Sequence, residues 1–316
     1  MFGALCGVLA ILWVLLGRLP PVPRPDPSRP ALSYADATAR FESIRARDGP
    51  VVNPECHPRV IAAGERTGRV IVLLHGFSNC PKQFDLLTTH FARMGFTVLV
   101  PRLPRHGMAD RMSADLGKLT AEELARAGEG AIDIAHGLGE HITVVGLSSS
   151  AVLGAWLAQH RTDIDCAVLL APSFAPHSVP APAARRLANA LLWLPNFFIW
   201  WDPRLRADLP GPRQSYPRFA THALAEVYRL GFGVLDAAAR SKPAAKIVLV
   251  TSAADDVVNN DVAFELARRW RSRGGDVRTF EFPASQHVHH DMIDPEQPYQ
   301  RIQVTYPVIE KLVSGA

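Results

Sequence analysis

The chain has 316 residues, of which 48% are hydrophobic and 20% are charged, as in a globular protein with room for one large domain or for one domain and a lid. Its formal net charge is only +4, from 34 basic and 30 acidic residues, and no run of Lys and Arg suited to a phosphate backbone occurs. The composition therefore excludes a mainly disordered chain, and the charge pattern argues against a nucleic-acid-binding protein.

The first segment, residues 2–17, is uninterruptedly apolar and ends at Arg18. It is shorter than a full membrane span, which takes about 20 residues, and it suits a signal-peptide core or a short anchor. No Lys or Arg precedes it and no small-residue cleavage motif follows it, which disfavours a cleaved signal. A buried N-terminal helix is the alternative, but six prolines from Pro20 to Pro30 indicate an extended linker that detaches the segment.

We therefore predict three parts of the chain. Residues 1–19 form an anchor or uncleaved signal with membrane association through residues 2–17, residues 20–31 form a proline-rich linker, and the domain occupies residues 32–316.

Helical and strand patterns alternate from residue 32 onward. Continuous apolar runs such as Val70 to Leu74 are typical of strands buried on both faces. Thr120, with Glu123 three residues later, forms a capping box that opens a helix. The patterns predict helices at 32–47, 83–94, 120–137, 151–160 and 298–313, and strands at 70–74, 97–100, 142–145, 167–170, 246–251 and 277–282. This alternation predicts an α/β fold with a parallel sheet that helices cover on both faces.

One stretch, at about residues 175–243, has no strand pattern and interrupts the alternation. Insertions of this kind act as caps over a site at the carboxyl ends of the strands. The stretch contains an aromatic run, residues 191–201, with three Trp and two Phe among its last nine residues. We expect part of this run to pack as an ordinary helix and part to line an apolar acyl pocket or to touch lipid.

The candidate nucleophile is Ser148, in the sequence Gly146-Leu147-Ser148-Ser149-Ser150 between a predicted strand and a predicted helix. A sharp strand-to-helix turn exposes its middle residue, which is the structural meaning of a G-x-S-x-G match. Ser150 stands where the pattern has its second glycine. The alternative is that the three serines only cap the following helix.

Candidates for the other groups of an acyl-transfer site follow other predicted strands. Asp255, preferred to Asp256 on spacing, follows the strand at 246–251, although aspartate is also common in turns for its own backbone bonds. His290 and its alternative His287 follow the last strand, and the short distance to the final helix favours His290. A metal site built on these histidines and His289 is disfavoured because no second cluster has ligand spacing.

An oxyanion hole needs backbone donors beside the nucleophile. His75-Gly76-Phe77 follows the strand at 70–74, and the glycine permits a sharp turn there. We predict that the backbone N–H groups of Phe77 and Ser149 hold the oxyanion.

Together these motifs make the chain resemble an α/β-hydrolase of the carboxylesterase and monoacylglycerol-lipase type over residues 50–315. The resemblance rests on His75-Gly76-Phe77 after its strand, on Pro104-Arg105-His106-Gly107, on the turn at Ser148, and on the order Ser, Asp, His. It implies an eight-stranded, mostly parallel sheet, a helical cap after the sixth strand and no cofactor.

The expected function is that of a serine hydrolase that cleaves carboxylic esters, with a small-molecule ester or lipid as substrate. An acyltransferase on the same scaffold, or a binding protein that has kept the fold without activity, are the alternatives; Ser150 supports the latter.

The cysteines bear on the compartment. Cys56 and Cys80 flank the first core strand and are candidates for a disulfide, which forms in an oxidising compartment, whereas Cys166 lies in a buried strand. Arg18, Arg24 and Arg29 all follow the apolar segment and favour the opposite, cytoplasmic orientation of the domain. We give the disulfide more weight and expect a membrane-anchored or exported protein on the periplasmic or extracellular side.

Overall fold

The computed structural model describes residue 7 and residues 19–315, so the predicted anchor at 2–17 lies almost entirely outside the described residues. In the part of the chain that is described, no helix is both long enough and apolar enough to cross a membrane.

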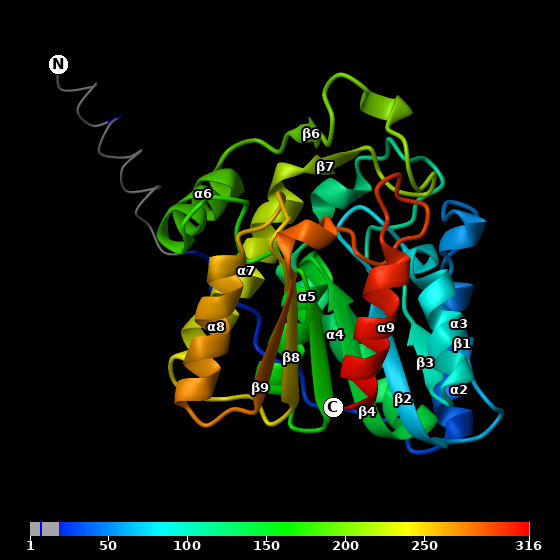
Figure 1. Ribbon diagram of the computed structural model, residues 1–316. Helices are drawn as coiled ribbons and strands as arrows, with labels where there is room; N and C mark the ends of the chain where they lie inside the picture. Colours follow the sequence, from blue (N-terminus) through cyan, green and yellow to red (C-terminus); the bar gives the residue numbers. More distant parts are fainter. Residues whose placement is uncertain (1–6, 8–18, 316) are drawn as a thin grey trace.

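The centre of the domain is a seven-stranded sheet with the order β1-β3-β2-β4-β5-β8-β9 (Figure 1). Only β1 runs antiparallel, against β3, and every other neighbouring pair is parallel. The strands are β1 (Arg59–Ile61), β2 (Thr67–Leu74), β3 (Thr97–Val100), β4 (Gly139–Leu147), β5 (Cys166–Leu170), β8 (Lys246–Ser252) and β9 (Val277–Phe282). The α/β fold with a mostly parallel sheet is thus confirmed. The described part of this central sheet has seven strands, where the resemblance implied eight.

Helices cover both faces of this sheet, and β2 shows why. Its side chains alternate, so that Val70, Val72 and Leu74 join one apolar core while Ile71 and Leu73 join the other. The first core is closed by α2 (Tyr34–Ala46), α4 (Ala121–Leu138), α5 (Ser149–His160), α7 (Thr221–Ala238) and α8 (Asn260–Ser272), and the second by α3 (Asp85–Arg93) and α9 (Ile302–Ser314). A strand buried on both faces needs a continuous apolar run, which is what the sequence of β2 contains.

Several predicted boundaries shift. The last helix begins at Ile302 and not at residue 298. At its first residue, the Gln300 side chain accepts the Ile302 N–H at 3.0 Å. The helix predicted at 83–94 is split into a 3-10 turn, η2 (Pro81–Phe84), and α3. Thr120 caps α4 with the reciprocal capping box that its spacing predicts.

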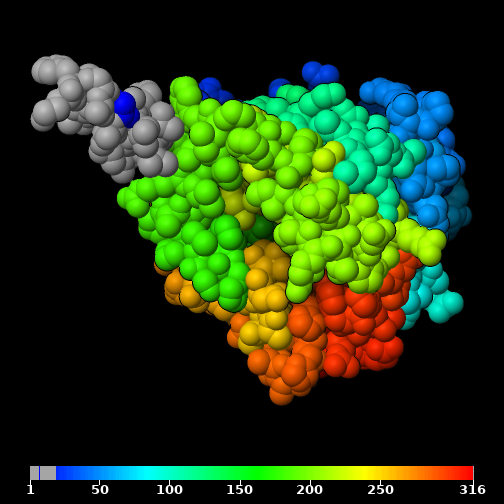
Figure 2. Space-filling view, turned by 90° about the horizontal axis from the view of Figure 1, so that it is seen from above, coloured from blue at the N-terminus to red at the C-terminus, as the bar shows by residue number. Residues whose placement is uncertain are grey.

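The insertion between β5 and β8 contains α6 (Ala181–Trp193) and a small hairpin of β6 (Phe198–Trp200) and β7 (Arg218–Ala220), and then α7. The expectation of no strand here is wrong, because strands of three residues are too short to show a period of two. The hairpin lies above the carboxyl ends of the sheet strands (Figure 1), and from above the insertion covers much of the domain (Figure 2). The insertion therefore lies over this edge of the sheet and is called the cap below.

The proline-rich segment 20–31 forms neither helix nor strand, and it is hydrogen-bonded to the domain instead of detaching from it. The backbone N–H of Asp26 donates to Glu129 of α4 at 2.9 Å, and Arg229 of α7 donates to the carbonyl of Pro21 at 2.6 Å. We call residues 20–31 the strap, because they run along the surface of the domain. A proline has no N–H to donate, but its carbonyl can still accept a hydrogen bond from a neighbouring helix.

Candidate active site

Ser148 occupies the sharp turn between β4 and α5. Its backbone has φ 60° and ψ −115°, a conformation that is strained for a residue with a side chain. The surroundings hold it there: the Ser148 N–H donates to the Leu170 carbonyl at 2.9 Å, and the Ser148 carbonyl accepts from Ser173 N–H at 3.1 Å. A Cβ at Gly146 would lie 2.2 Å from the Ser150 carbonyl oxygen, so the first position of the motif requires glycine.

Ser150, which replaces the second glycine of the motif, has a use for its hydroxyl. The residue is buried, and its Oγ donates a hydrogen bond to the backbone carbonyl of His75. This bond joins the start of α5 to the end of β2. The substitution therefore leaves the turn intact and adds a link between the two segments that carry the predicted oxyanion donors.

The side chains of Ser148, His290 and Asp255 form one hydrogen-bonded row. Ser148 Oγ lies 2.8 Å from His290 Nε2, and His290 Nδ1 lies 2.8 Å from Asp255 Oδ2. The other Asp255 oxygen, Oδ1, accepts the backbone N–H groups of Val257 at 2.9 Å and Val258 at 3.2 Å. Because a carboxylate can only accept, His290 carries its proton on Nδ1, and Nε2 is free to accept the serine proton.

Burial and charge act in opposite directions on the two ionisable groups of this row. Burial disfavours the imidazolium form of His290, but the charge and hydrogen bond of Asp255 outweigh it, so the pKa of His290 is raised above its usual value. Burial likewise disfavours the Asp255 carboxylate, but His290 and the two backbone N–H donors keep the pKa of Asp255 below its usual value. The carboxylate is therefore ready to stabilise a positive charge on the imidazole.

The alternatives for these positions point elsewhere. His287 ends the short 3-10 turn η5 (Ala284–Gln286) in a left-handed conformation with φ 50°, and its side chain is exposed. His289 packs its ring against Tyr299, with centroids 4.9 Å apart, and Asp256 is exposed. Within residues 19–315 no group of three or more His, Cys, Asp or Glu side chains is placed to hold a metal ion.

The predicted oxyanion turn, residues 75–77, is held by a chain of buried hydrogen bonds. Leu103 N–H donates to His75 Nε2 at 3.1 Å, so the ring proton is on Nδ1, which donates to the Gly76 carbonyl at 3.1 Å. Burial, helped by the nearby His106 ring, keeps the pKa of His75 well below its usual value, so the ring stays neutral.

These bonds set the direction of the Phe77 N–H. A peptide unit is planar and trans, so the N–H of Phe77 points opposite to the Gly76 carbonyl, which also accepts the Asn79 N–H at 3.2 Å. Among the described residues, the N–H groups of Phe77 and Ser149 have no protein acceptor. Ser149 is also the first residue of α5, where the helix dipole favours negative charge.

A cavity of about 330 Å³ opens beside Ser148 and His290. Phe77, Trp201, Leu209 and other apolar side chains form much of its wall, together with polar groups near His290. This size and character are typical of small-molecule sites.

The residues of the aromatic run at 191–201 lie in different surroundings. Trp201 lines the cavity, and its Nε1 donates to Ser78 Oγ at 3.1 Å. Trp193 at the end of α6 and Phe197 instead point outward, with 63% and 55% of their surfaces exposed. The run therefore contributes to the site through Trp201.

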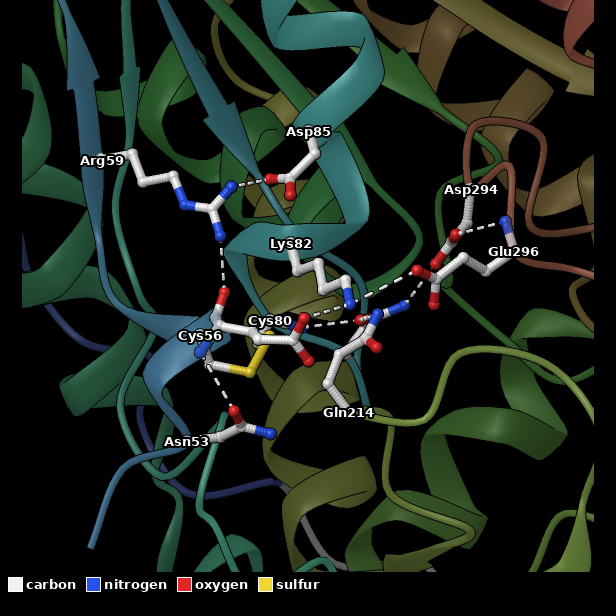
Figure 3. Close-up of polar contacts among 11 residues, drawn as sticks. Asn53, Cys56, Arg59, Cys80, Lys82, Asp85, Gln214, Asp294 and Glu296 are labelled. Atoms are coloured by element: carbon white, nitrogen blue, oxygen red, sulfur yellow. Dashed lines mark hydrogen bonds and ion pairs between the residues drawn. A yellow bond between two sulfur atoms is a disulfide. The ribbon is translucent and has the colours of Figure 1, made fainter. Parts of the chain in front are cut away.

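Cys56 and Cys80 are joined by a disulfide, with their Cα atoms 5.3 Å apart (Figure 3). The bond connects η1 (Pro54–Cys56) to the residue that follows the turn at 75–79. Gly107, with φ 69°, packs against it so closely that a Cβ there would lie 2.7 Å from the Cys56 Cβ. Cys166 is a free, buried thiol, and burial raises its pKa to about 12, which makes it unreactive.

Several buried polar side chains around the site were not predicted from the sequence, among them Asn79, Gln83 and Asp294. Amide side chains in irregular turns have no periodicity and belong to no catalytic pattern. Only their position directly after the His75-Gly76-Phe77 turn, and in the loop after His290, could have drawn attention to them.

Such a fold, with a serine turn after β4 and loops after β8 and β9 that converge on it, defines an α/β hydrolase. The sequence pattern of the alpha/beta hydrolase family matches residues 71–302, and the chain belongs to this family.

Among curated proteins, the chain is 28% identical over 163 residues to the thermostable monoacylglycerol lipase of Bacillus sp. strain H-257. The aligned part is 51% of this chain and spans 60% of the Bacillus protein. Among solved structures, the monoacylglycerol lipase of Paleococcus ferrophilus has a TM-score of 0.62 at 20% identity, covering 82% of this chain and 99% of that one.

A soluble variant of the monoglyceride lipase of Saccharomyces cerevisiae has a TM-score of 0.64 at 14% identity, covering 82% and 90%. At these identities the structural comparisons show a shared fold.

Proposed function

We propose that the protein is a serine hydrolase that cleaves carboxylic esters of apolar acyl groups. The observation that carries this proposal is the continuous row from Ser148 through His290 to Asp255, with the N–H groups of Phe77 and Ser149 beside it. A serine next to an oriented base and two unoccupied donors has the parts that acyl transfer needs.

In the proposed reaction, Ser148 Oγ attacks the ester carbonyl carbon while His290 Nε2 takes the hydroxyl proton. The carbonyl oxygen becomes an oxyanion and accepts hydrogen bonds from Phe77 and Ser149 N–H. The imidazolium, stabilised by Asp255, gives its proton to the leaving alkoxide, and the alcohol departs. Water then attacks the acyl-enzyme, loses a proton to His290, and the acid leaves as the proton returns to Ser148 Oγ.

The substrate we propose is a fatty acyl ester of a small alcohol, in the manner of a monoacylglycerol. Two of the structural relatives and the curated relative are monoacylglycerol lipases, and the apolar wall formed by Phe77, Trp201 and Leu209 suits an acyl chain. Exposed apolar side chains on the cap, including Trp193 and Phe197, support access to esters held in lipid aggregates.

Replacement of the nucleophile tests the proposal. Ser148→Ala should lower kcat on p-nitrophenyl butyrate by roughly 10⁴-fold or more, with an unchanged melting temperature, because the covalent intermediate can no longer form. A fluorophosphonate probe should label the wild type and leave the variant unlabelled. Retained turnover in the variant would refute Ser148 as the nucleophile. A wild type that is neither active nor labelled would refute the proposed function and favour a binding protein.

The acyltransferase alternative differs only in what resolves the acyl-enzyme. Product analysis with glycerol or a short alcohol added to the water distinguishes the two. A hydrolase releases mostly free fatty acid, and an excess of new ester over acid would identify a transferase.

We also propose that the domain lies outside the cytoplasm and is held at a membrane by residues 2–17. The disulfide between Cys56 and Cys80 supports an oxidising compartment, and the apolar composition of residues 2–17 supports the anchor. Mass spectrometry of the protein after rapid alkylation of intact cells should find both cysteines oxidised. Alkylated, reduced cysteines in the cellular protein would contradict the location.

A further inference from the structure

Gln83 connects the two loops that carry the proposed oxyanion donor and the proposed base. It lies in η2, directly behind the turn at 75–77, and only 2% of its surface is exposed. Its carboxamide oxygen accepts the Gly76 N–H at 2.8 Å, and its Nε2 donates to Asp291 Oδ2 at 2.9 Å. Gly76 precedes Phe77 in the chain and Asp291 follows His290, so one side chain touches the neighbours of both groups.

Each of the two bonds restrains a different part of the site. The bond to Gly76 restrains the backbone N–H of that residue. The Gly76 carbonyl belongs to the same peptide unit as the Phe77 N–H, so the orientation of Gly76 sets the direction of that N–H. The bond to Asp291 holds the backbone immediately after His290, whose imidazole must meet Ser148 Oγ at hydrogen-bond distance. A carboxamide suits this task because it has an acceptor at one corner and a donor at the other.

Other bonds keep the same loops folded without Gln83. Asn79 Nδ2 donates to Asp294 Oδ2 at 3.0 Å, and Lys82 lies between Glu55 and Glu296, at 2.6 Å and 3.4 Å (Figure 3). The disulfide between Cys56 and Cys80 also holds the residue that follows this turn. Because these contacts remain when Gln83 is replaced, its removal is expected to shift the loops slightly rather than unfold them.

We propose that Gln83 is a positioning residue that sets the proposed oxyanion donor, Phe77 N–H, in register with the proposed base, His290. The inference rests on the proposed function. The bond to Gly76 is buried and the bond to Asp291 is partly buried. Small displacements of a preorganised donor weaken the stabilisation of a developing oxyanion.

The test uses a side chain of similar length that makes neither bond. Gln83→Met in the full chain should lower kcat on p-nitrophenyl butyrate roughly 10-fold or more, part of the 10²–10³-fold loss seen when an oxyanion donor is removed. KM should change less than about 2-fold, because the effect arises in the transition state.

Gln297 provides a matched control. Its Nε2 donates to the same Asp291 oxygen at 2.9 Å, but it makes no bond to the oxyanion turn. Gln297→Met should lower kcat by less than about 3-fold. Equal losses in the two variants would show that only the support of Asp291 matters, and would overturn the proposal.

An exchange of the two groups tests the link directly. In the double variant Gln83→Glu with Asp291→Asn, the new carboxylate accepts both the Gly76 N–H and the new amide at position 291. Its kcat should exceed that of the single variant Gln83→Glu, in which two carboxylates face each other. A double variant whose kcat is no higher than that of Gln83→Glu would overturn the proposal. This comparison holds even if Gln83→Met has a lowered melting temperature.

Hydrogen exchange separates this inference from the proposed function. Amides of residues 75–80 should exchange faster in Gln83→Met than in the wild type and in Gln297→Met, whatever the turnover. An inactive wild type with this exchange pattern would refute the proposed function, but it would support the connection that Gln83 makes between the two loops. An active Gln83→Met variant with unchanged exchange would refute the link and keep the function.

Discussion

Replacement of Ser150 is the sharpest test of how the turn at Ser148 and the predicted oxyanion turn, residues 75–77, depend on each other. Ser150 occupies the position where the G-x-S-x-G pattern has glycine, and its hydroxyl donates to the buried carbonyl of His75. The bond crosses from α5 to the end of β2. We expect Ser150→Ala and Ser150→Gly to weaken the protein, although the second restores the motif.

The magnitudes follow from the environment of the bond. Removal of the hydroxyl leaves a buried carbonyl without this donor, which costs about 1–3 kcal/mol. Ser150→Gly costs about 1 kcal/mol more than Ser150→Ala, because glycine is less favourable in the helix. Because His75 also orients the Gly76 carbonyl, part of the oxyanion stabilisation should be lost as well, and kcat should fall roughly 3-fold to 10-fold.

Urea unfolding with kcat and KM on p-nitrophenyl butyrate measures both effects. The order of the free energy of unfolding should be wild type, then Ser150→Ala, then Ser150→Gly. If Ser150→Gly equals or exceeds the wild type in stability and in kcat, the hydroxyl is merely tolerated and the reasoning is wrong.

Two further predictions concern the base and the disulfide. The pKa of His290 is raised above 6.5, and the proposed reaction needs its neutral imidazole. We therefore expect kcat/KM to fall about tenfold per pH unit below a midpoint above pH 6.5, and a midpoint at or below 6.5 would contradict this. His290→Ala should abolish turnover, while His287→Ala keeps both kcat and the midpoint. The double variant Cys56→Ser with Cys80→Ser removes a disulfide whose cysteines have a sequence separation of 24. It should lower the free energy of unfolding by about 3 kcal/mol in chemical denaturation. An unchanged free energy of unfolding would show that the disulfide does not stabilise the fold.

The strands that carry the candidate site were predictable because burial on both faces forces apolar runs, as in β2, β5 and β8. The loops after parallel strands meet at one edge of the sheet, so their order along the chain was enough to place Ser148 and Asp255 together. The strands β1, β6 and β7, of three residues each, were missed because such a length has no measurable period.

Within the site, the remaining details depend on backbone geometry that a sequence pattern does not contain. His287 and His290 are both histidines in the loop after the last strand, so the sequence alone does not distinguish their roles. In the structure the backbone is left-handed at His287 and its side chain is exposed. The link made by Gln83 depends on two loops that are far apart in the sequence. The strap at 20–31 could be predicted to be extended, but not to bond to α4 and α7, because prolines define the backbone shape and not its partner.

The cap is not a separable module of this enzyme-like scaffold. Ser78, next to Phe77, has its carbonyl bound by the Tyr216 N–H at 2.7 Å and by Ser215 Oγ at 3.2 Å, and its hydroxyl is bound by Trp201. A chimera that exchanged the insertion with that of a relative would remove these supports of the predicted oxyanion turn along with part of the cavity wall. Such grafts on this scaffold should therefore retain Trp201, Ser215 and Tyr216 and vary the outer helix α6 instead.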